Sequence, residues 1–170
     1  MKIHIIGCSG SGKTYLANAL SKKYNISHFD LDDIQWDNNA KEYGKKRTLD
    51  ERKALLQEIL YNNDEWIIEV VYYAWVQQSF DEADKIYVLD MPGYLYKSRI
   101  IMRSIKRKLG IQKGKRETLK SVYNLLKWTE TFQNKNLKEI RSILDRYDNK
   151  VIWLSRKKDV EKIIKAVCLT

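Results

Sequence analysis

Short apolar runs alternate with amphipathic stretches along the chain. Runs of this kind, bounded by polar turns, are typical of strands buried in a parallel sheet. They occupy residues 2–7, 27–31, 65–71, 85–90 and 150–155. Between and after them, apolar residues recur at intervals of three and four, which indicates helices. The helices expected from this spacing cover 13–24, 48–61, 94–108, 116–131, 137–147 and 159–167, and 37–47 is expected to be a loop.

This alternation predicts an α/β fold with three layers, in which a five-stranded parallel sheet carries helices on both faces. A length of 170 residues fits one domain with a sizeable core, so we expect residues 1–170 to form a single domain. The stretch of about 105–136 is helical and polar and has no strand of its own. We expect it to form a helical lid over the carboxyl ends of the strands, where open α/β sheets bind ligands.

The first strand leads into a glycine-rich segment, GCSGSGKT, at residues 7–14. Its spacing, glycine, four residues, then Gly-Lys-Thr, is that of a loop that wraps the phosphates of a nucleoside triphosphate. Glycines let the backbone amides turn toward phosphate oxygens, and the following helix adds the positive end of its dipole. The predicted nucleotide-binding residues are Gly7, Ser9, Gly10, Ser11, Gly12, Lys13 and Thr14.

Two residues of this segment have distinct predicted roles. Lys13 would reach the β and γ phosphates and act in catalysis, and Thr14 would offer its hydroxyl to Mg²⁺. The expected ligands are therefore ATP and Mg²⁺. The alternative is a glycine-rich turn that binds nothing. Cys8 also lies in the loop, but no neighbouring base is evident to activate it, so we expect a small residue that fits.

Acidic residues follow three of the predicted strands. Asp30, Asp32 and Asp33 come after the second strand, on the same sheet edge as the glycine-rich loop. Asp32 is the first candidate for a catalytic base or for water-mediated Mg²⁺ binding, whereas helix capping would explain Asp30 or Asp33. Glu69 and Asp90 end the third and fourth strands, and strand order decides which lies beside the loop. We favour Glu69 as a metal contact, against a purely structural acid.

The positive charge is concentrated in one segment. The chain has a net charge of +10, and residues 93–128 hold eleven Lys or Arg residues and one acid, Glu117. The other 21 basic and 21 acidic residues therefore cancel. Arg99 and Arg103 lie four apart on a predicted helix and so share a face that Arg107 extends. Such a face suits phosphates, with Arg103 as a catalytic candidate, although basic helix faces often meet only solvent.

The remaining residues bear on where the protein is located in the cell and on which side chains line its core or its ligand site. Two cysteines, Cys8 and Cys168, form neither a disulfide framework nor a metal cluster, so we expect reduced thiols in a cytoplasmic protein. No stretch has the length of a membrane span or the start of a signal peptide, and we expect no membrane partner. His4 and His28 are expected to be strand or core residues. The aromatic residues Trp36, Tyr72, Tyr73 and Trp75 suit either core packing or stacking on a ligand.

Several motifs together point to a family. Beside GCSGSGKT the chain carries FDLDDIQW at 29–36, WIIEVVYYAW at 66–75, LLKW at 125–128 and VIWLSRKKDVEKII at 151–164. With these it resembles the adenylate kinase and shikimate kinase group of small P-loop kinases, and looks most like the DNA topology modulation (FlaR-related) proteins. The resemblance implies strand order 2-3-1-4-5 and a mobile helical lid.

The resemblance also implies roles for single residues. Arg99 would lie against the nucleotide base, Arg103 near its phosphates, and Arg156 would frame the adenine. Asp32 corresponds to the acid that contacts acceptor or magnesium in related sugar-acid kinases. The chain departs from the pattern at Val70, where relatives usually carry glycine, and this puts acceptor binding in doubt.

Three functions follow from these observations. The first is a kinase that passes the γ-phosphoryl group of ATP to a nucleotide or small-molecule acceptor. The second is a nucleic-acid-binding protein regulated by nucleotide, with the basic segment as its surface, although no known nucleic-acid-binding motif is visible. The third is a slow NTPase without an acceptor. We expect a monomer or a homodimer.

Overall fold

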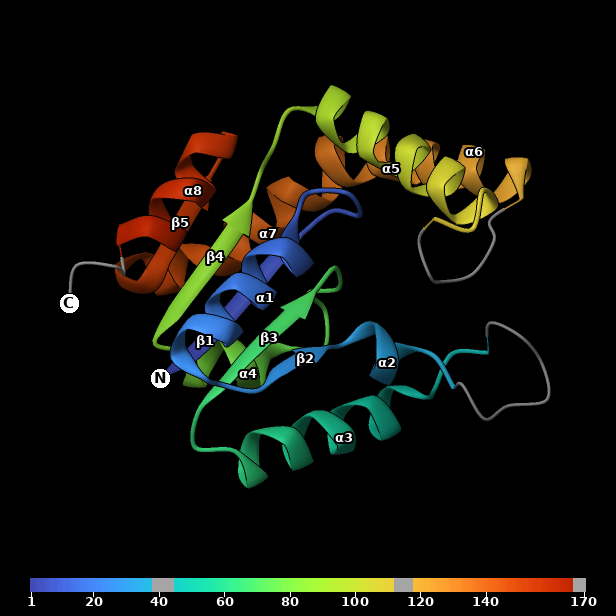
Figure 1. Ribbon diagram of the computed structural model, residues 1–170. Coiled ribbons are helices and arrows are strands. Elements are labelled where there is room, and N and C mark those ends of the chain that lie inside the picture. The colour runs from blue at the N-terminus through green and yellow to red at the C-terminus, as the bar shows by residue number, and fades with distance from the viewer. Residues whose placement is uncertain (38–44, 112–117, 167–170) are drawn as a thin grey trace.

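The structure is a computed structural model that describes residues 1–37, 45–111 and 118–166 (Figure 1). Part of the basic segment, at 112–117, and Cys168 lie outside the described residues. Five strands form one parallel sheet in the order β2-β3-β1-β4-β5. They are β1 (Lys2–Gly7), β2 (His28–Asp30), β3 (Trp66–Val70), β4 (Lys85–Leu89) and β5 (Val151–Leu154).

Helices cover both faces of this sheet. In Figure 1, α1 and α8 lie in front of the sheet, α4 and α7 lie behind it, and α5 and α6 pack together above its carboxyl end. The α-helices are α1 (Lys13–Tyr24), α2 (Asp32–Gln35), α3 (Leu49–Asn62), α4 (Gln77–Glu82), α5 (Gly93–Lys108), α6 (Leu119–Thr131), α7 (Leu137–Leu144) and α8 (Lys157–Ala166).

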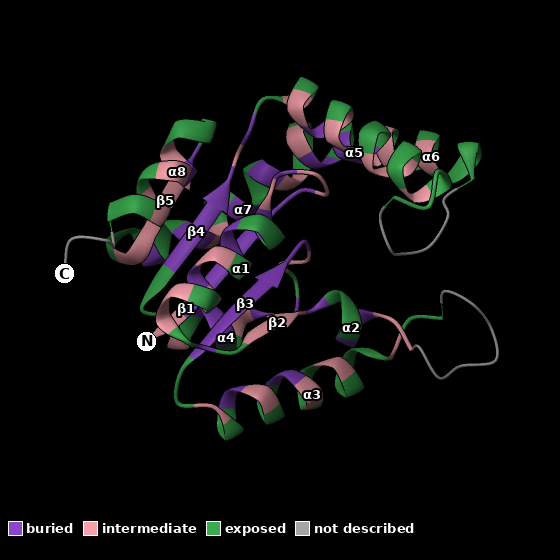
Figure 2. Cartoon of the chain, viewed as in Figure 1, coloured by how far each residue is buried: buried purple, intermediate pink, exposed green. Residues whose placement is uncertain are grey.

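The core lies in the three central strands and the helices that cover them (Figure 2). All five residues of β3 are buried, and so are Ile3, Ile5 and Ile6 of β1. Because both faces of a parallel sheet are covered, its central strands are mostly apolar and do not alternate with polar residues, and His4 of β1 and Glu69 of β3 are the buried polar residues among the described parts of these strands. Each such side chain contributes about 1.5–3 kcal/mol on burial. The strands are therefore a rigid base for the loops that follow them.

Local signals fix the ends of the helices that flank the site. Helix α1 ends at Asn25, whose positive φ of 57° lets its N–H bond the carbonyl of Ser21. Helix α3 begins with a capping box. The Thr48 hydroxyl accepts a hydrogen bond from the Glu51 N–H at 3.3 Å, and Glu51 Oε2 accepts one from the Thr48 N–H at 2.7 Å.

The parallel sheet, its strand order and the flanking helices confirm the predicted α/β/α fold. The prediction of one helix over 137–147 was wrong only in its last three residues. Helix α7 ends at Leu144, and a 3-10 helix (Asp145–Lys150) follows because Tyr147 leaves helical geometry at φ −115°. The short helices α2 and α4 were not predicted, since so few residues show no helical periodicity. In the predicted lid, α5 is continuous from Gly93, and a π-helix (Phe132–Asn136) joins α6 to α7.

A buried histidine makes stability depend on pH. The His4 side chain is fully buried in β1, where Nδ1 lies 3.0 Å from the Ser79 hydroxyl and the ring packs edge-on against Phe80. Burial lowers the pKa of His4 from 6.5 to about 3. Between these values the unfolded chain binds a proton that the folded chain does not.

We therefore expect the free energy of unfolding to fall as the pH drops below about 6.5, with His4 contributing up to about 1.4 kcal/mol per pH unit. Urea unfolding at several pH values measures this slope. The variant His4→Leu should have a shallower slope by about one proton, whatever its stability at neutral pH. Equal slopes in the two proteins would contradict the prediction.

Candidate functional site

The glycine-rich loop connects the buried end of β1 to the first turn of α1. Gly10 and Gly12 adopt positive φ angles of 79° and 103°, which favour glycine strongly. The loop closes on itself through a hydrogen bond from the Ser11 N–H to the Cys8 carbonyl at 3.1 Å. Helix α5 lies directly against it, because a Cβ atom added to Gly10 would lie 2.9 Å from the Tyr96 carbonyl oxygen. The loop is therefore curled, as its spacing predicts.

Lys13 and Cys8 are both held within this loop. Lys13 is buried, and its ammonium group donates a hydrogen bond to the Cys8 carbonyl at 3.1 Å. The Cys8 thiol is fully buried, and burial raises its pKa to about 11. A protonated, buried thiol is unreactive, and this agrees with the expectation that Cys8 is a small residue that fits the loop.

A carboxylate stands beside the hydroxyl at the start of α1. Thr14 Oγ1 donates a hydrogen bond to Glu69 Oε2 at 3.0 Å, and the other Glu69 oxygen lies 3.1 Å from His28 Nε2. His28 Nδ1 in turn lies 3.1 Å from Asn18 Oδ1. Glu69 is almost fully buried and takes this place because β3 pairs with β1, with Glu69 opposite Ile5.

Hydroxyl and carboxylate oxygens are ligands that suit Mg²⁺, so Thr14 and Glu69 fit the predicted metal site. Within the described ranges, no three or more acidic, histidine or cysteine side chains are arranged so that they alone could hold a metal ion. Mg²⁺ does not need one, because it is usually held by one or two carboxylates together with phosphate oxygens and water.

Strand order does not by itself separate Glu69 from Asp90. Both β3 and β4 flank β1, so each acid ends a strand that neighbours the loop. The contact of Thr14 with Glu69 distinguishes them. Asp90 lies on the β5 side, where its N–H bonds the Leu154 carbonyl and Arg141 partly offsets the rise that burial causes in its pKa.

The acids after β2 enter the same cavity. Asp30 ends β2, and its Oδ1 accepts a hydrogen bond from the Asp32 N–H at 2.9 Å, so it orients the start of α2. Burial raises the pKa of Asp30 to about 6. The Asp32 side chain is open to the cavity, yet the cavity walls shield it from bulk water, and this raises its pKa. Lys13 opposes that rise. Asp33 does not line the cavity.

The basic face of α5 closes the opposite wall. Arg99, Arg103 and Arg107 all line the cavity, as expected for residues four apart on one helix. Arg99 also bonds the loop, since its Nη1 donates to the carbonyls of Gly10 and Ser11 at 3.1 and 2.7 Å. Their predicted roles toward base and phosphates stay predictions, but all three arginines line the cavity.

The cavity bounded by these groups has a volume of about 1050 Å³. Trp36 and Tyr72 are among its lining residues, together with Trp128 of α6. Tyr73 bonds Glu139 instead, and Trp75 is buried with Arg52 over its ring. Val70 is buried in the core, whereas the next residue, Val71, lines the cavity. The Val70 side chain therefore does not line this cavity, and its effect on acceptor binding stays a prediction.

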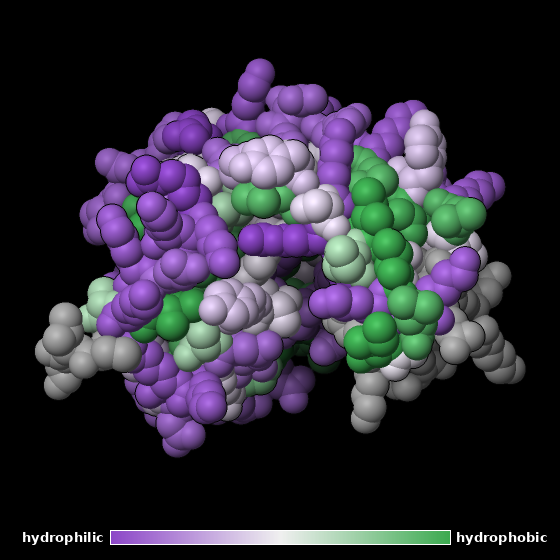
Figure 3. All heavy atoms as spheres, turned by 45° about the horizontal axis from the view of Figure 1, so that its top comes forward, coloured by the Kyte–Doolittle hydropathy of each residue, from purple (hydrophilic) through white to green (hydrophobic). Residues whose placement is uncertain are grey.

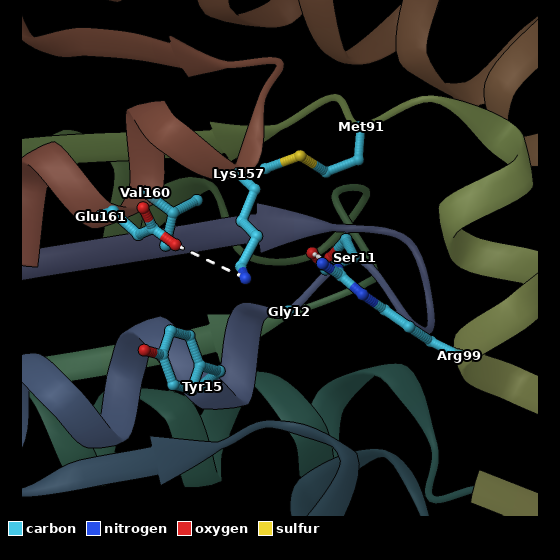
Figure 4. A pocket seen from close by; sticks show the side chains of 8 residues that line it. All are labelled: Ser11, Gly12, Tyr15, Met91, Arg99, Lys157, Val160 and Glu161. Carbon is cyan, nitrogen blue, oxygen red and sulfur yellow. Dashed lines mark hydrogen bonds and ion pairs between the residues drawn. The ribbon is translucent and has the colours of Figure 1, made fainter. Parts of the chain in front are cut away.

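A smaller pocket of about 380 Å³ adjoins the loop on its other side (Figure 4). Its apolar surface comes from Tyr15, Met91 and Val160, and Arg99 lines both this pocket and the cavity. Lys157 and Glu161, at its rim, form an ion pair at 3.5 Å. An apolar slot next to a phosphate loop suits the flat ring of a nucleotide base.

Sequence reasoning missed most of this pocket. Arg156 was predicted to frame the adenine, but it does not line the pocket. Its guanidinium pairs with Asp159 at 3.1 Å, and its neighbour Lys157 lines the pocket instead. The available signal was that β5 ends at the same sheet edge as β1, which brings the start of α8 to the loop. Nothing in the spacing of Tyr15 or Met91 marks them.

No model of a known protein family matches the chain. An uncharacterized protein of Bacillus subtilis (strain 168), YqaC, is 29% identical over 140 residues, which cover 82% of this chain and 76% of YqaC. Membership of the DNA topology modulation proteins stays a prediction.

Among solved structures, a shikimate kinase from Acinetobacter baumannii in complex with shikimate is similar with a TM-score of 0.62 and 15% identity, over 98% of this chain and 92% of the kinase. A gluconokinase from Sinorhizobium meliloti 1021 has a TM-score of 0.56 and 13% identity, over 98% and 88%. At such identities the likeness concerns the fold. The chain shares the fold of these structures, a five-stranded parallel sheet in the order 2-3-1-4-5 flanked by helices.

The loop geometry yields a matched pair of variants. Gly10 and Gly110 both have positive φ, 79° and 73°, but an added Cβ meets the α5 backbone only at Gly10 and finds no atom within 4 Å at Gly110. Both alanine variants should lose about 1–2 kcal/mol of stability from backbone strain. Gly10→Ala should in addition bind ATP about tenfold or more weakly, because the loop must shift. Urea unfolding and calorimetric titration with ATP test this, and equal ATP affinity in the two variants would contradict it.

Proposed function

We propose that this protein is a kinase that transfers the γ-phosphoryl group of ATP to a nucleotide or another small-molecule acceptor, with Mg²⁺ as cofactor. One observation carries the proposal. The curled glycine-rich loop, the Thr14–Glu69 pair, Asp32 and the arginine face of α5 all border a single cavity. Phosphoryl transfer depends on positioning and charge neutralisation, and these are the groups it requires.

In this proposal the base of ATP occupies the apolar pocket and its phosphates lie along the loop. Lys13 leaves the Cys8 carbonyl, to which it is bonded now, and contacts the β and γ phosphates. Thr14 and Glu69 would hold Mg²⁺, and Asp32 would be a further contact to it. The metal supplies positive charge that stabilises the phosphate oxygens. Arg103 neutralises the transferring group, and Arg99 spans base and phosphates.

The transfer step is a displacement at phosphorus. A lone pair of the acceptor oxygen forms the new bond to the γ phosphorus, and the bond from that phosphorus to the bridging oxygen breaks. The electron pair of the broken bond stays with ADP. When the acceptor is a hydroxyl, its proton passes to Asp32. Burial raises the pKa of Asp32, which brings this carboxylate closer to the pH at which a general base is most effective.

The part of the cavity that ATP would leave open is the proposed acceptor site. Beyond the loop, the cavity continues between Asp32 and Trp36 on one side and Trp128 on the other, and Lys46 and Arg107 also border it. Similar folds belong to proteins named shikimate kinase and gluconokinase, whose names denote small hydroxylated molecules. These observations support a small acceptor.

The two alternatives fit the geometry less well. A nucleic-acid surface would present its arginines outward, whereas Arg99, Arg103 and Arg107 line the cavity. An NTPase without an acceptor needs no cavity beyond the phosphates. The kinase proposal explains the cavity and the arginines together.

A phosphotransfer screen with labelled ATP across nucleosides, nucleotides and small hydroxy acids tests the proposal. We expect transfer to one acceptor class, reduced about 10²-fold or more by Lys13→Ala and by Asp32→Asn, because each removes a group that acts on the transferred phosphoryl or the acceptor proton. Asp33→Asn is the matched control, since Asp33 is the next residue in α2 but does not line the cavity. Release of phosphate to water alone, accelerated by DNA, would instead support the nucleic-acid alternative.

A further inference from the structure

Helix α5 has a second, outward face that the proposed kinase does not use. Ile101, Met102, Ile105 and Leu109 are exposed, with 44%, 53%, 46% and 67% of their surface accessible. Ile101, Ile105 and Leu109 recur at intervals of four, and Met102 lies three residues before Ile105, so the four side chains form an outer apolar stripe along one side of the helix. Figure 3 shows apolar side chains gathered on this face of the molecule. Tyr94, at the start of the helix, is also exposed, at 71%.

The outer apolar stripe points away from the nucleotide. Ile101, Ile105 and Leu109 each follow a cavity-lining arginine by two residues. Two residues turn an α-helix by about 200°, so the stripe is on the opposite side from the arginines. A ligand in the cavity cannot cover it. A contiguous apolar patch that stays exposed on a folded protein marks a binding surface.

Positive charge borders this stripe. Helix α5 has no acidic residue, and the exposed side chains of Lys106 and Lys108 flank Ile105 and Leu109. Lys97, nearer the start of the helix, is paired with Glu130 of α6 at 2.5 Å and contributes less. The surface that covers the stripe must therefore be apolar and negatively charged.

The apolar stripe and the positive charge beside it together decide which kind of partner can cover this face of α5. A second copy of the chain would bring another strongly basic surface into contact, and like charges would oppose it. A nucleic acid supplies negative charge but no partner for a row of aliphatic side chains. An anionic bilayer supplies both, because apolar side chains enter the boundary of its acyl chains while lysines contact lipid phosphates.

We propose that the outer apolar stripe of α5 binds the surface of a membrane containing anionic phospholipid, with the helix lying in the plane of the interface. In the described part of the chain, no helix is long and apolar enough to cross a bilayer. The contact is thus peripheral, and it differs from the sequence-based expectation of no membrane partner, which considered only spanning segments. It leaves the arginine face free and does not depend on the proposed kinase activity.

Vesicle co-sedimentation tests the proposal with two lipid compositions, phosphatidylcholine alone and phosphatidylcholine mixed with phosphatidylglycerol. The wild-type protein should bind the mixed vesicles and bind phosphatidylcholine alone much more weakly. The double variant Ile105→Glu, Leu109→Glu should bind the mixed vesicles about tenfold or more weakly, since it removes two inserted apolar side chains. The matched control is Tyr61→Glu, which places the same charge on α3 at a tyrosine that is 87% exposed.

A second variant separates charge from insertion. Lys106→Glu combined with Lys108→Glu should lose binding to mixed vesicles while leaving the apolar stripe intact. All variants should keep the wild-type circular dichroism spectrum and unfold cooperatively in urea, which shows that they are folded. Equal binding of the Ile105/Leu109 variant and the wild type would overturn the proposal. So would a wild-type dimer, seen by light scattering, that this variant dissociates, or binding to a single-stranded oligonucleotide that this variant alone loses.

Discussion

The close approach between the glycine-rich loop and helix α5 determines the rest of the site. Gly10 leaves no room for a side chain between the loop and the Tyr96 backbone, and Arg99 of the same helix bonds two loop carbonyls. Tyr96 is itself fixed, because its hydroxyl donates to the Leu89 carbonyl and accepts from the Met91 N–H. The end of β4, the loop and the arginine face are therefore held as one unit. Both pockets border this unit.

A second network ties the loop to the other side of the sheet. Thr14 bonds Glu69, Glu69 contacts His28, and His28 reaches Asn18 of α1. The network joins α1 to β3 and β2 at the point where a metal ion would be held. A buried carboxylate needs such partners, because an unpaired charge in the interior is costly. This network thus stabilises the sheet edge and also fixes the positions of the Thr14 and Glu69 oxygen atoms.

The sequence predicted what depends on local spacing and on the shared edge of parallel strands. The loop from Gly7 to Thr14 follows from its spacing, and Asp32 and Glu69 enter the cavity because strands β2 and β3 end beside β1. It could not predict the apolar pocket, where Tyr15, Met91 and Val160 come from three segments that only the fold brings together.

Contacts made by single side chains were also beyond the sequence. Whether Val70 or Val71 reaches the cavity depends on where the strand ends, since neighbouring side chains of a strand point to opposite faces. Likewise, the sequence does not show that Lys157 and not Arg156 lines the smaller pocket. Arg156 is instead paired with Asp159 of α8.

The position of Arg99 has a consequence for what the protein can distinguish. One guanidinium borders both compartments and also bonds the loop between them. In the proposed kinase, the base and the phosphates of ATP would therefore meet the same side chain. Inorganic polyphosphate would fill only the cavity and a free nucleoside only the smaller pocket, so each would contact Arg99 from one side alone.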